Sequence, residues 1–371
     1  MHASNRARTA IFITVLVDLL GFGIVIPILP LYAKAIADHP SAWMASVNSF
    51  LGLGGAHTTP GAFWAGVGFL SYSLMQFIAS PILGRISDLS GRKPVLWISL
   101  LGSAFGYLML ALTSRFEWVL AARILDGITG GNISVAQAAM ADVSLPEERS
   151  KVMGMIGAAF GLGFVLGPPL GGILSGSAWG QQLLATRGWH LPFFVAAGLS
   201  LLASTLVVAW LPETLTPEVR ARAGKAESRG HALVRTLQIK GMPQLLAISL
   251  LTMIGFAAME GTIALLAEQR FAFKQWDVGM KIFLPIGILL VLYQGGLVRV
   301  VALASQLTPI EDQGSLFGAL NAVSSVGRIL GPAFGTFTFA RWGGHVTYTM
   351  AGLTLALALV VALTLPKRSA A

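Results

Sequence analysis

Long apolar runs, separated by short polar segments, are the dominant pattern along this chain. A helix that crosses a bilayer needs about 20 mostly apolar residues, because each residue advances about 1.5 Å through about 30 Å of hydrocarbon. The pattern therefore predicts an all-α integral membrane protein. Runs of sufficient length predict ten crossings, at residues 11–33, 62–83, 95–113, 117–141, 152–175, 190–211, 243–266, 277–298, 314–338 and 346–366.

One long polar stretch, residues 212–242, interrupts the pattern. It carries Lys and Arg at intervals and contains no run of spanning length, so we interpret it as a linker. It separates an N-terminal bundle of six predicted helices, residues 1–211, from a shorter C-terminal bundle of about four, residues 243–371. An even number of crossings places both termini on the same side of the membrane.

Composition supports this interpretation. Of the 371 residues, 55% are hydrophobic and 11% are charged, and the mean hydropathy is +0.74. A soluble domain has about 25% charged residues. The chain has no cysteine, which excludes disulfides and thiolate metal sites. No spacing indicates another metal site, a phosphate-binding glycine loop or a catalytic triad, so we expect neither an enzyme nor a cofactor.

The positive charge of the chain is distributed as membrane topology requires. A net charge of +9 would also fit a nucleic-acid-binding protein, but the cations lie beside the apolar runs. The termini, the linker and residues 84–94, 142–151 and 299–313 hold 16 of the 25 Lys and Arg residues. Because cytoplasmic loops are enriched in these residues, both termini and the linker are predicted to be cytoplasmic. The basic N-terminus continues into the run 11–33, which is too long for a signal-peptide core, so the first helix is expected to be retained.

A short charged segment between the second and third runs carries the most specific motif. Gly84 and Gly91 allow a tight turn, and Asp88, Arg92 and Lys93 place both signs of charge on a connection too short to form a domain. This pattern, G-x-x-x-D-x-x-G-R-K, is similar to the loop between the second and third helices of major facilitator superfamily transporters.

Further segments resemble the drug:proton antiporter branch of that family, and tetracycline-efflux proteins in particular. These segments are Asp18–Pro30, Tyr72–Asp88, Arg123–Gly131 and Gly163–Gly172. The resemblance implies the major facilitator fold, with two helical bundles and a plan of twelve helices. It also implies that the charged loop holds an outward-open state.

Two roles are open for the charged residues of that loop. Asp88 is expected to lie at the cytoplasmic mouth and to cap the N-terminus of the eleventh helix of the plan, near Gly314. Arg92 and Lys93 are either part of this gate or anchors that only fix the topology.

An internal repeat links the two halves of the chain. Residues 145–172 match residues 309–336 at a constant offset of 164. Two halves built from one repeat are typical of secondary transporters. The matched positions include Gly163, Gly167, Pro168 and Gly171, which correspond to Gly327, Gly331, Pro332 and Gly335.

The same comparison predicts a gap in the second half. Gly84 and Gly167 are 83 residues apart, whereas Gly296 and Gly331 are 35 apart. The difference is about two membrane-spanning helices. We expect the ninth helix and most of the tenth to be absent, with the junction at Arg299–Ala302. A natural deletion, an engineered deletion and a segment missing from the sequence are all compatible with this pattern.

Five charged residues lie away from the edges of the predicted crossings, where a charge costs at least about 2.5–3.5 kcal/mol, so each is a candidate for function. Arg123 and Asp126 share a helix face and can pair, either as a structural ion pair or as a proton relay. Asp18 and Glu260 are expected to bind protons or substrate, and Arg328 to pair with an acid of the other half. Gln76 and Asn132 are uncharged candidates for the cavity.

The glycine-proline segment of the fifth helix is the third candidate feature. Gly163, Gly167 and Gly171 allow another helix to approach closely, and Pro168 interrupts the helical hydrogen bonds. This arrangement predicts a pliable interface for movement between two states, tight packing alone, or both.

The function predicted from these features is proton-coupled efflux of small amphipathic compounds, such as tetracycline-like drugs, by alternating access. The resemblance implies a role in antibiotic resistance and a place in the bacterial inner membrane. Two alternatives are open: an uptake symporter of the same fold, and an incomplete protein that does not transport. The second follows from the gap, because loss of the tenth helix would open one wall of the cavity. Substrate identity and oligomeric state are not predicted.

Overall fold

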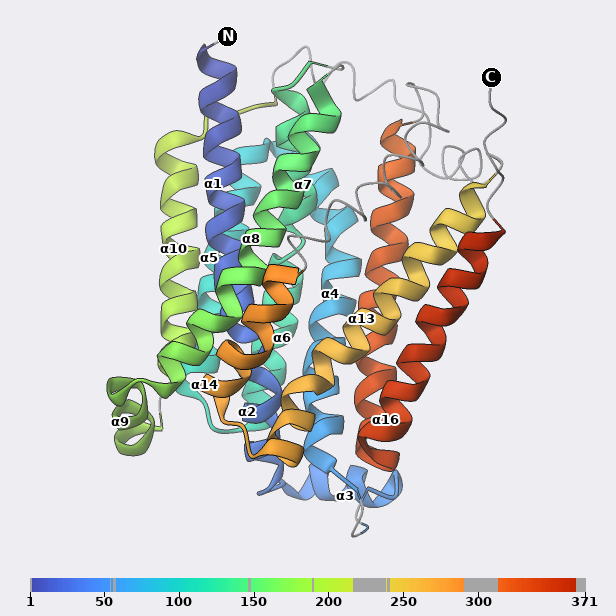
Figure 1. The fold of residues 1–371 in the computed structure, drawn as a ribbon. Helices are drawn as coiled ribbons and strands as arrows, with labels where there is room; N and C mark the ends of the chain where they lie inside the picture. The colour runs from blue at the N-terminus through green and yellow to red at the C-terminus, as the bar shows by residue number, and fades with distance from the viewer. Residues whose placement is uncertain are drawn as a thin grey trace.

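A computed structural model describes residues 2–53, 55, 58–145, 148–188, 190–215, 238, 241–289 and 313–364. All regular elements of the described residues are helices. Figure 1 shows them as a bundle in which α1 begins and α16 ends toward the same side. We call this side the termini end.

The helices of the described residues have the following bounds. They are α1 (His2–Val25), α2 (Leu29–Ala37), α3 (Ala42–Phe50), α4 (Pro60–Ser90), α5 (Arg92–Leu112), α6 (Phe116–Thr129), α7 (Asn132–Asp142), α8 (Arg149–Gly176), α9 (Ala178–Arg187), α10 (Leu191–Trp210), α13 (Met242–Phe271), α14 (Gln275–Asp277), the π-helical η2 (Val278–Phe283) and α16 (Gln313–Leu363).

Seven helical segments among the described residues are long and apolar enough to cross a membrane. Six of them correspond to predicted crossings, and the seventh, Ala322–Leu363, covers most of the last two. Gly343 separates these two inside α16, with φ of +79°, a conformation that favours glycine. The fourth predicted crossing is divided into α6 and α7 at Gly130 and Gly131.

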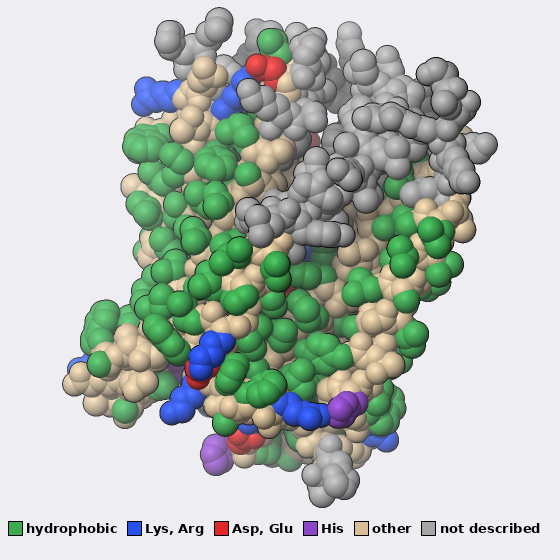
Figure 2. Space-filling model, viewed as in Figure 1, with side chains coloured by type: hydrophobic (Ala, Val, Ile, Leu, Met, Phe, Trp, Pro, Cys, Tyr) green, Lys and Arg blue, Asp and Glu red, His purple; other side chains and the backbone are tan. Residues whose placement is uncertain are grey.

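The surface has the distribution expected of a membrane protein. Large hydrophobic side chains are exposed along the helices, including Ile98 (60%) and Leu353 (63%). Figure 2 shows hydrophobic side chains across the middle of one face, with the charged side chains toward its ends. The apolar band lies where the predicted crossings would meet lipid tails.

The internal repeat predicted from sequence appears as repeated packing. A Cβ atom on Gly167 of α8 would lie 2.5 Å from the Cα of Gly23 in α1, so these two helices pack at backbone distance. A Cβ on the matching Gly331 of α16 would lie 2.6 Å from the Cβ of Ala257 in α13. The glycines therefore allow close packing in both halves.

Helix α8 has a second glycine contact, toward the other half of the chain. A Cβ on Gly172 would lie 3.2 Å from the Cα of Gly279 in η2. A Cβ on Gly279 would lie 2.8 Å from the carbonyl oxygen of Pro168. Helix α8 thus contacts α1 on one face and η2 on another, with glycines at both contacts.

Polar contacts join the first and second halves, residues 1–211 and 243–371, near α3. Lys34 Nζ lies 2.8 Å from Glu268 Oε1. Arg341 Nη1 donates to the carbonyl of Leu51 at 2.7 Å, and the Thr59 amide donates to the carbonyl of Ala340 at 2.8 Å. Figure 1 shows α3 at the end opposite the start of α1. We call this end the closed end.

The predicted crossing 277–298 is described only to residue 289, where it contains the end of α14 and all of η2. Two further predictions lie outside the described residues. The junction at Arg299–Ala302 is one of them, and most of the linker 212–242 is the other. The division into bundles at 1–211 and 243–371 remains a prediction.

Candidate functional site

Asp18 lies where α1, α7 and α10 meet. Asn132 Nδ2 donates to Asp18 Oδ2 at 3.3 Å, and the Ser200 hydroxyl donates to Asp18 Oδ1 at 3.4 Å. Asn132 is 4% exposed, and Ser200 is fully buried. The structure therefore brings together two residues singled out in the sequence, Asp18 and Asn132. It adds Ser200, which sequence reasoning missed because a lone serine in an apolar helix carries no distinctive signal.

Arg123 and Asp126 form a buried ion pair on α6, as their spacing predicts. Arg123 Nη2 lies 2.5 Å from Asp126 Oδ2, and each side chain is 2% exposed. The guanidinium carbon lies 4.5 Å from the centre of the Tyr72 ring, which gives a cation–π contact. Arg123 Nε is buried without a hydrogen bond among the described residues. Within the part of the chain that the structure describes, this N–H is therefore a donor that could take another partner.

Gln76 is fixed between helices. Its amide nitrogen donates to the Tyr72 hydroxyl at 3.0 Å and to the carbonyl of Gly130 at 2.9 Å. Gly130 is the residue at which α6 ends, and a helix end leaves carbonyl groups without an intrahelical donor. Among the candidate roles, this geometry favours a bond between helices over a substrate contact.

Glu260 of α13 lies in a small cavity between the halves. The free space is about 10 Å³, room for about one water molecule. Phe164 of α8 belongs to the first half, so both halves contribute to the walls. The lining residues are Phe164, Phe256, Met259, Glu260, Phe283, Ile286 and Gly287.

A chain of aromatic contacts connects this cavity with the group formed by Arg123, Asp126 and Tyr72. The ring of Phe164 lies 6.5 Å from that of Phe256 and 6.1 Å from that of Phe22. Phe22 in turn stacks on Tyr72 at 5.4 Å. The two charged sites therefore lie on one continuous path through the interface between the halves.

Arg328 contacts the other half through an aromatic ring. Its guanidinium carbon lies 5.8 Å from the ring of Phe160, on α8 of the other half. No ion pair with an acid of the first half is present within the described residues. Among the described residues, the contact of Arg328 with the other half is with an aromatic ring, on which a guanidinium can stack.

The segment Gly84–Lys93 is not the open loop predicted from sequence, because α4 continues to Ser90 and α5 begins at Arg92. Gly84 is helical, and the turn is at Gly91 alone. The contacts of this charged segment centre on Arg92, which is 5% exposed. Arg92 Nη1 lies 2.6 Å from Asp88 Oδ1, and Arg92 Nε lies 3.0 Å from Asp142 Oδ2. Gly91 adopts φ of +108°, which favours glycine. A residue that only fixes the topology would not need this set of buried contacts. Lys93 differs, because its amine is exposed and donates to the carbonyl of Val208.

Glu213 also belongs to the group of contacts around Arg92, and sequence reasoning missed it. Its carboxylate accepts the backbone N–H of Arg92 at 2.9 Å and that of Lys93 at 3.2 Å. These donors form the N-terminus of α5, which attracts negative charge. The available signal was an acid directly after the end of an apolar run, in an otherwise basic stretch.

The predicted contact of Asp88 with the eleventh helix remains a prediction. Helix α16 begins at Gln313, but its first side chains lie outside the described residues. Within the described part, Asp88 pairs with Arg92.

A family model and the sequences of known proteins assign this chain to the same family. Residues 11–300 match the model of the Major Facilitator Superfamily. The chain is 30% identical to human major facilitator superfamily domain-containing protein 10 over 321 residues, covering 80% of this chain and 68% of that protein. It is 31% identical to the class C tetracycline resistance protein of Escherichia coli over 407 residues, covering 95% of both.

A solved structure agrees with these relatives. The crystal structure of the human organic anion transporter MFSD10 aligns with a TM-score of 0.69 at 24% identity, over 96% of this chain and 99% of that chain. The alignment with the class C protein has 407 positions, more than the 371 residues of this chain. That alignment therefore includes positions of the relative without a counterpart here, and the predicted junction at Arg299–Ala302 remains a prediction. The chain belongs to the major facilitator superfamily, and it is a multi-pass membrane transporter rather than an enzyme.

Proposed function

We propose that this protein exports small amphipathic compounds in exchange for protons, by alternating access. The observation that carries the proposal is the pair of acids on opposite halves. Asp18 lies at a junction of three helices, and Glu260 lines a cavity between the halves. A buried charge is costly in a membrane, and such acids are characteristic of proton pathways.

Proton uptake at Asp18 has a clear structural consequence. The two hydrogen bonds to its oxygens, at 3.3 and 3.4 Å, are long. Protonation would remove the negative charge that both donors face, and would add a donor of its own. Because Asn132 is on α7 and Ser200 is on α10, this change would alter how α1 sits against two neighbouring helices.

Substrate binding requires that the halves separate near Glu260. The cavity there holds about one water and cannot hold a drug-sized molecule. The polar contacts at the closed end oppose separation on that side. With both termini in the cytoplasm of a bacterial cell, the observed arrangement corresponds to closure toward the outside.

The network around Arg92 supports a rigid cytoplasmic end for the first half. It joins α4 through Asp88, α7 through Asp142 and the segment after α10 through Glu213. Ties among three helices favour movement of this end as a unit, as rocking between two states requires.

Proton movement in inverted membrane vesicles tests the proposal. Addition of a transported compound should release protons from vesicles that contain the wild-type chain, and Asp18→Asn should reduce the signal at least about tenfold. Asp38→Asn, a matched change of an exposed acid at the closed end, should leave the signal intact. Absence of a response in the wild type, across cationic, neutral and anionic compounds, would favour the alternative of a chain that does not transport.

A second candidate function is the transport of organic anions. Arg328 places a guanidinium at the interface between the halves, and one relative is described as an organic anion transporter. Competition between anionic and cationic dyes separates the two possibilities. Loss of anion transport in Arg328→Gln, with cation transport unchanged, would support this second function over the first.

A further inference from the structure

We propose that a groove between the start of α1 and the end of α10 binds an anionic phospholipid. The groove has a volume of about 340 Å³ and lies at the termini end. Asn5, Arg6, Thr9 and Ala10 of α1 line it together with Trp210, the last residue of α10. This site is separate from Asp18, Glu260 and the Arg92 loop.

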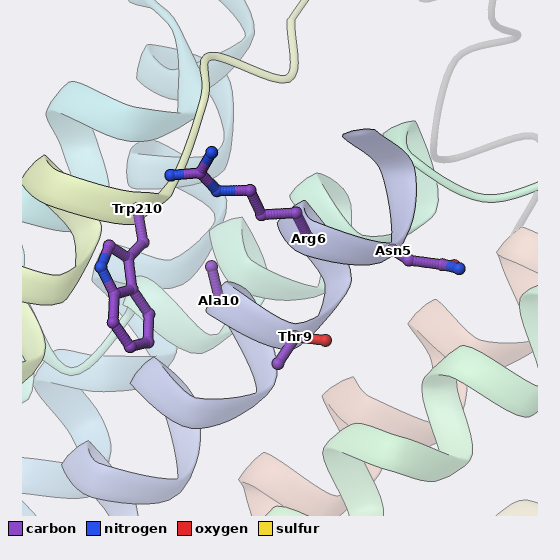
Figure 3. Close-up of a pocket in the computed structure, with 5 residues that line it drawn as sticks. All are labelled: Asn5, Arg6, Thr9, Ala10 and Trp210. Carbon is purple, nitrogen blue, oxygen red and sulfur yellow. The ribbon is translucent and has the colours of Figure 1, made fainter. Parts of the chain in front are cut away.

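The groove has one cationic wall and one aromatic wall. Figure 3 shows the Arg6 side chain extending across toward the indole of Trp210, with Ala10 between them on α1. The amide of Asn5 points the other way. A phosphate can therefore accept hydrogen bonds from the guanidinium while an acyl chain lies against Ala10 and the indole face.

Arg6 is available for such a ligand. It is exposed, and it makes no hydrogen bond or ion pair with the described residues. Arg8, two residues further on, is already bound to the carbonyl of Val143 at 3.1 Å and to Glu148 at 2.5 Å. The two arginines thus have different roles, one fixed within the protein and one facing the groove.

The depth of the groove matches lipid headgroups. Trp210 ends a membrane-spanning helix and is 48% exposed, which is typical of the aromatic belt at a membrane surface. Arg6 precedes the first predicted apolar run by five residues, near the level of the phosphates. Arg6 gives the site its preference for negative charge, and the apolar wall favours a lipid over a free phosphate ion.

Native mass spectrometry of the full chain in detergent tests the proposal. The purified protein is titrated with phosphatidylglycerol and, separately, with phosphatidylcholine carrying the same acyl chains. The wild type should retain one phosphatidylglycerol with an affinity at least about fivefold above that for phosphatidylcholine. Arg6→Gln should remove the preference, and Trp210→Ala should weaken binding of both lipids.

Arg85→Gln is the matched control, since Arg85 is also exposed at the termini end but does not line the groove. It should retain the wild-type preference. Equal affinity for both lipids in the wild type would overturn the proposal. The same conclusion would follow if Arg6→Gln and Arg85→Gln reduced the preference equally, because the effect would then reflect general surface charge.

Discussion

At the scale of single residues, neighbouring cations in the charged loop differ sharply in environment. Arg92 is buried and contacts Asp88, Asp142 and the hydroxyl of Ser87, whereas Lys93 uses an exposed amine. A planar guanidinium can serve several acceptors at once, which a single ammonium group does less well. The motif therefore depends on the order of the two cations and not only on their charge.

This difference predicts unequal effects of two adjacent substitutions. Arg92→Ala leaves Asp88 and Asp142 without their shared cation and should lower the free energy of unfolding by about 3 kcal/mol. Lys93→Ala should cost less than about 1 kcal/mol, because the amine is exposed. Thermal unfolding in detergent, followed by tryptophan fluorescence, measures both. Equal losses would contradict the assigned role of Arg92.

His190 gives a prediction about pH. It directly precedes α10, outside the membrane-spanning segment, and its ring lies 4.4 Å from that of Tyr32. Burial lowers the pKa of His190 from 6.5 to about 4, so the folded state favours the neutral ring. Above about pH 6.5 the ring is neutral in both the folded and the unfolded state, and the protein has its full stability. As the pH falls from about 6.5 toward 4, the unfolded state takes up the proton first. The free energy of unfolding should therefore fall, by at most about 3 kcal/mol.

The variant His190→Phe tests this dependence, because it keeps a ring beside Tyr32 but does not titrate. Unfolding temperature measured between pH 7 and pH 4 should fall less steeply in this variant than in the wild type. His39→Gln, at an exposed position of the same end, should follow the wild-type curve.

At the scale of elements, glycines fix the distance between helices. Gly167→Ala would place a Cβ 2.5 Å from the Cα of Gly23, so α8 and α1 must separate. We expect a loss of about 1–3 kcal/mol in the free energy of unfolding. Gly157→Ala, on the same helix with open space around it, should be neutral or stabilising by up to about 1 kcal/mol. A substantial loss in the second variant as well would show that helix conformation, and not packing, sets the effect.

The amino-acid sequence predicted where the helices lie better than it predicted where they are interrupted or which residues they contact. The length of an apolar run is a local property, and it located most crossings within a few residues. The turn at Ile26–Ile28 and the break at Gly130 depend on packing against neighbouring helices, so apolar length did not indicate them. Glu213 was missed because its partner Arg92 is 121 residues away in the chain.

At the scale of the whole molecule, contacts join the halves at the closed end, and the proposed alternating access requires these contacts to break. Lys34→Glu would place two acids together at Glu268 and should weaken closure, whereas adding Glu268→Lys restores an opposite pair. The chain has no native cysteine, so cysteines introduced at Thr59 and Ala340 report closure by disulfide formation. Crosslinking should fall in the single variant and recover in the double variant.

The outcome of that experiment distinguishes two explanations of closure. Recovery in the double variant would show that the ion pair itself contributes to closure. Persistent loss would indicate that the surrounding backbone contacts depend on the native residues in their native positions.

The two glycine faces of α8 have a consequence for kinetics. At its contact with η2, α8 presents glycines and the apolar ring of Phe164, and no described side-chain hydrogen bond links it to η2. A sliding or rotating movement at this crossing would break few directional bonds, so internal friction there should be low. The activation barrier for switching states should then arise at the ends of the molecule, in contacts such as Lys34–Glu268. Substitutions at the ends should therefore change the rate of switching more than conservative ones along the middle of α8.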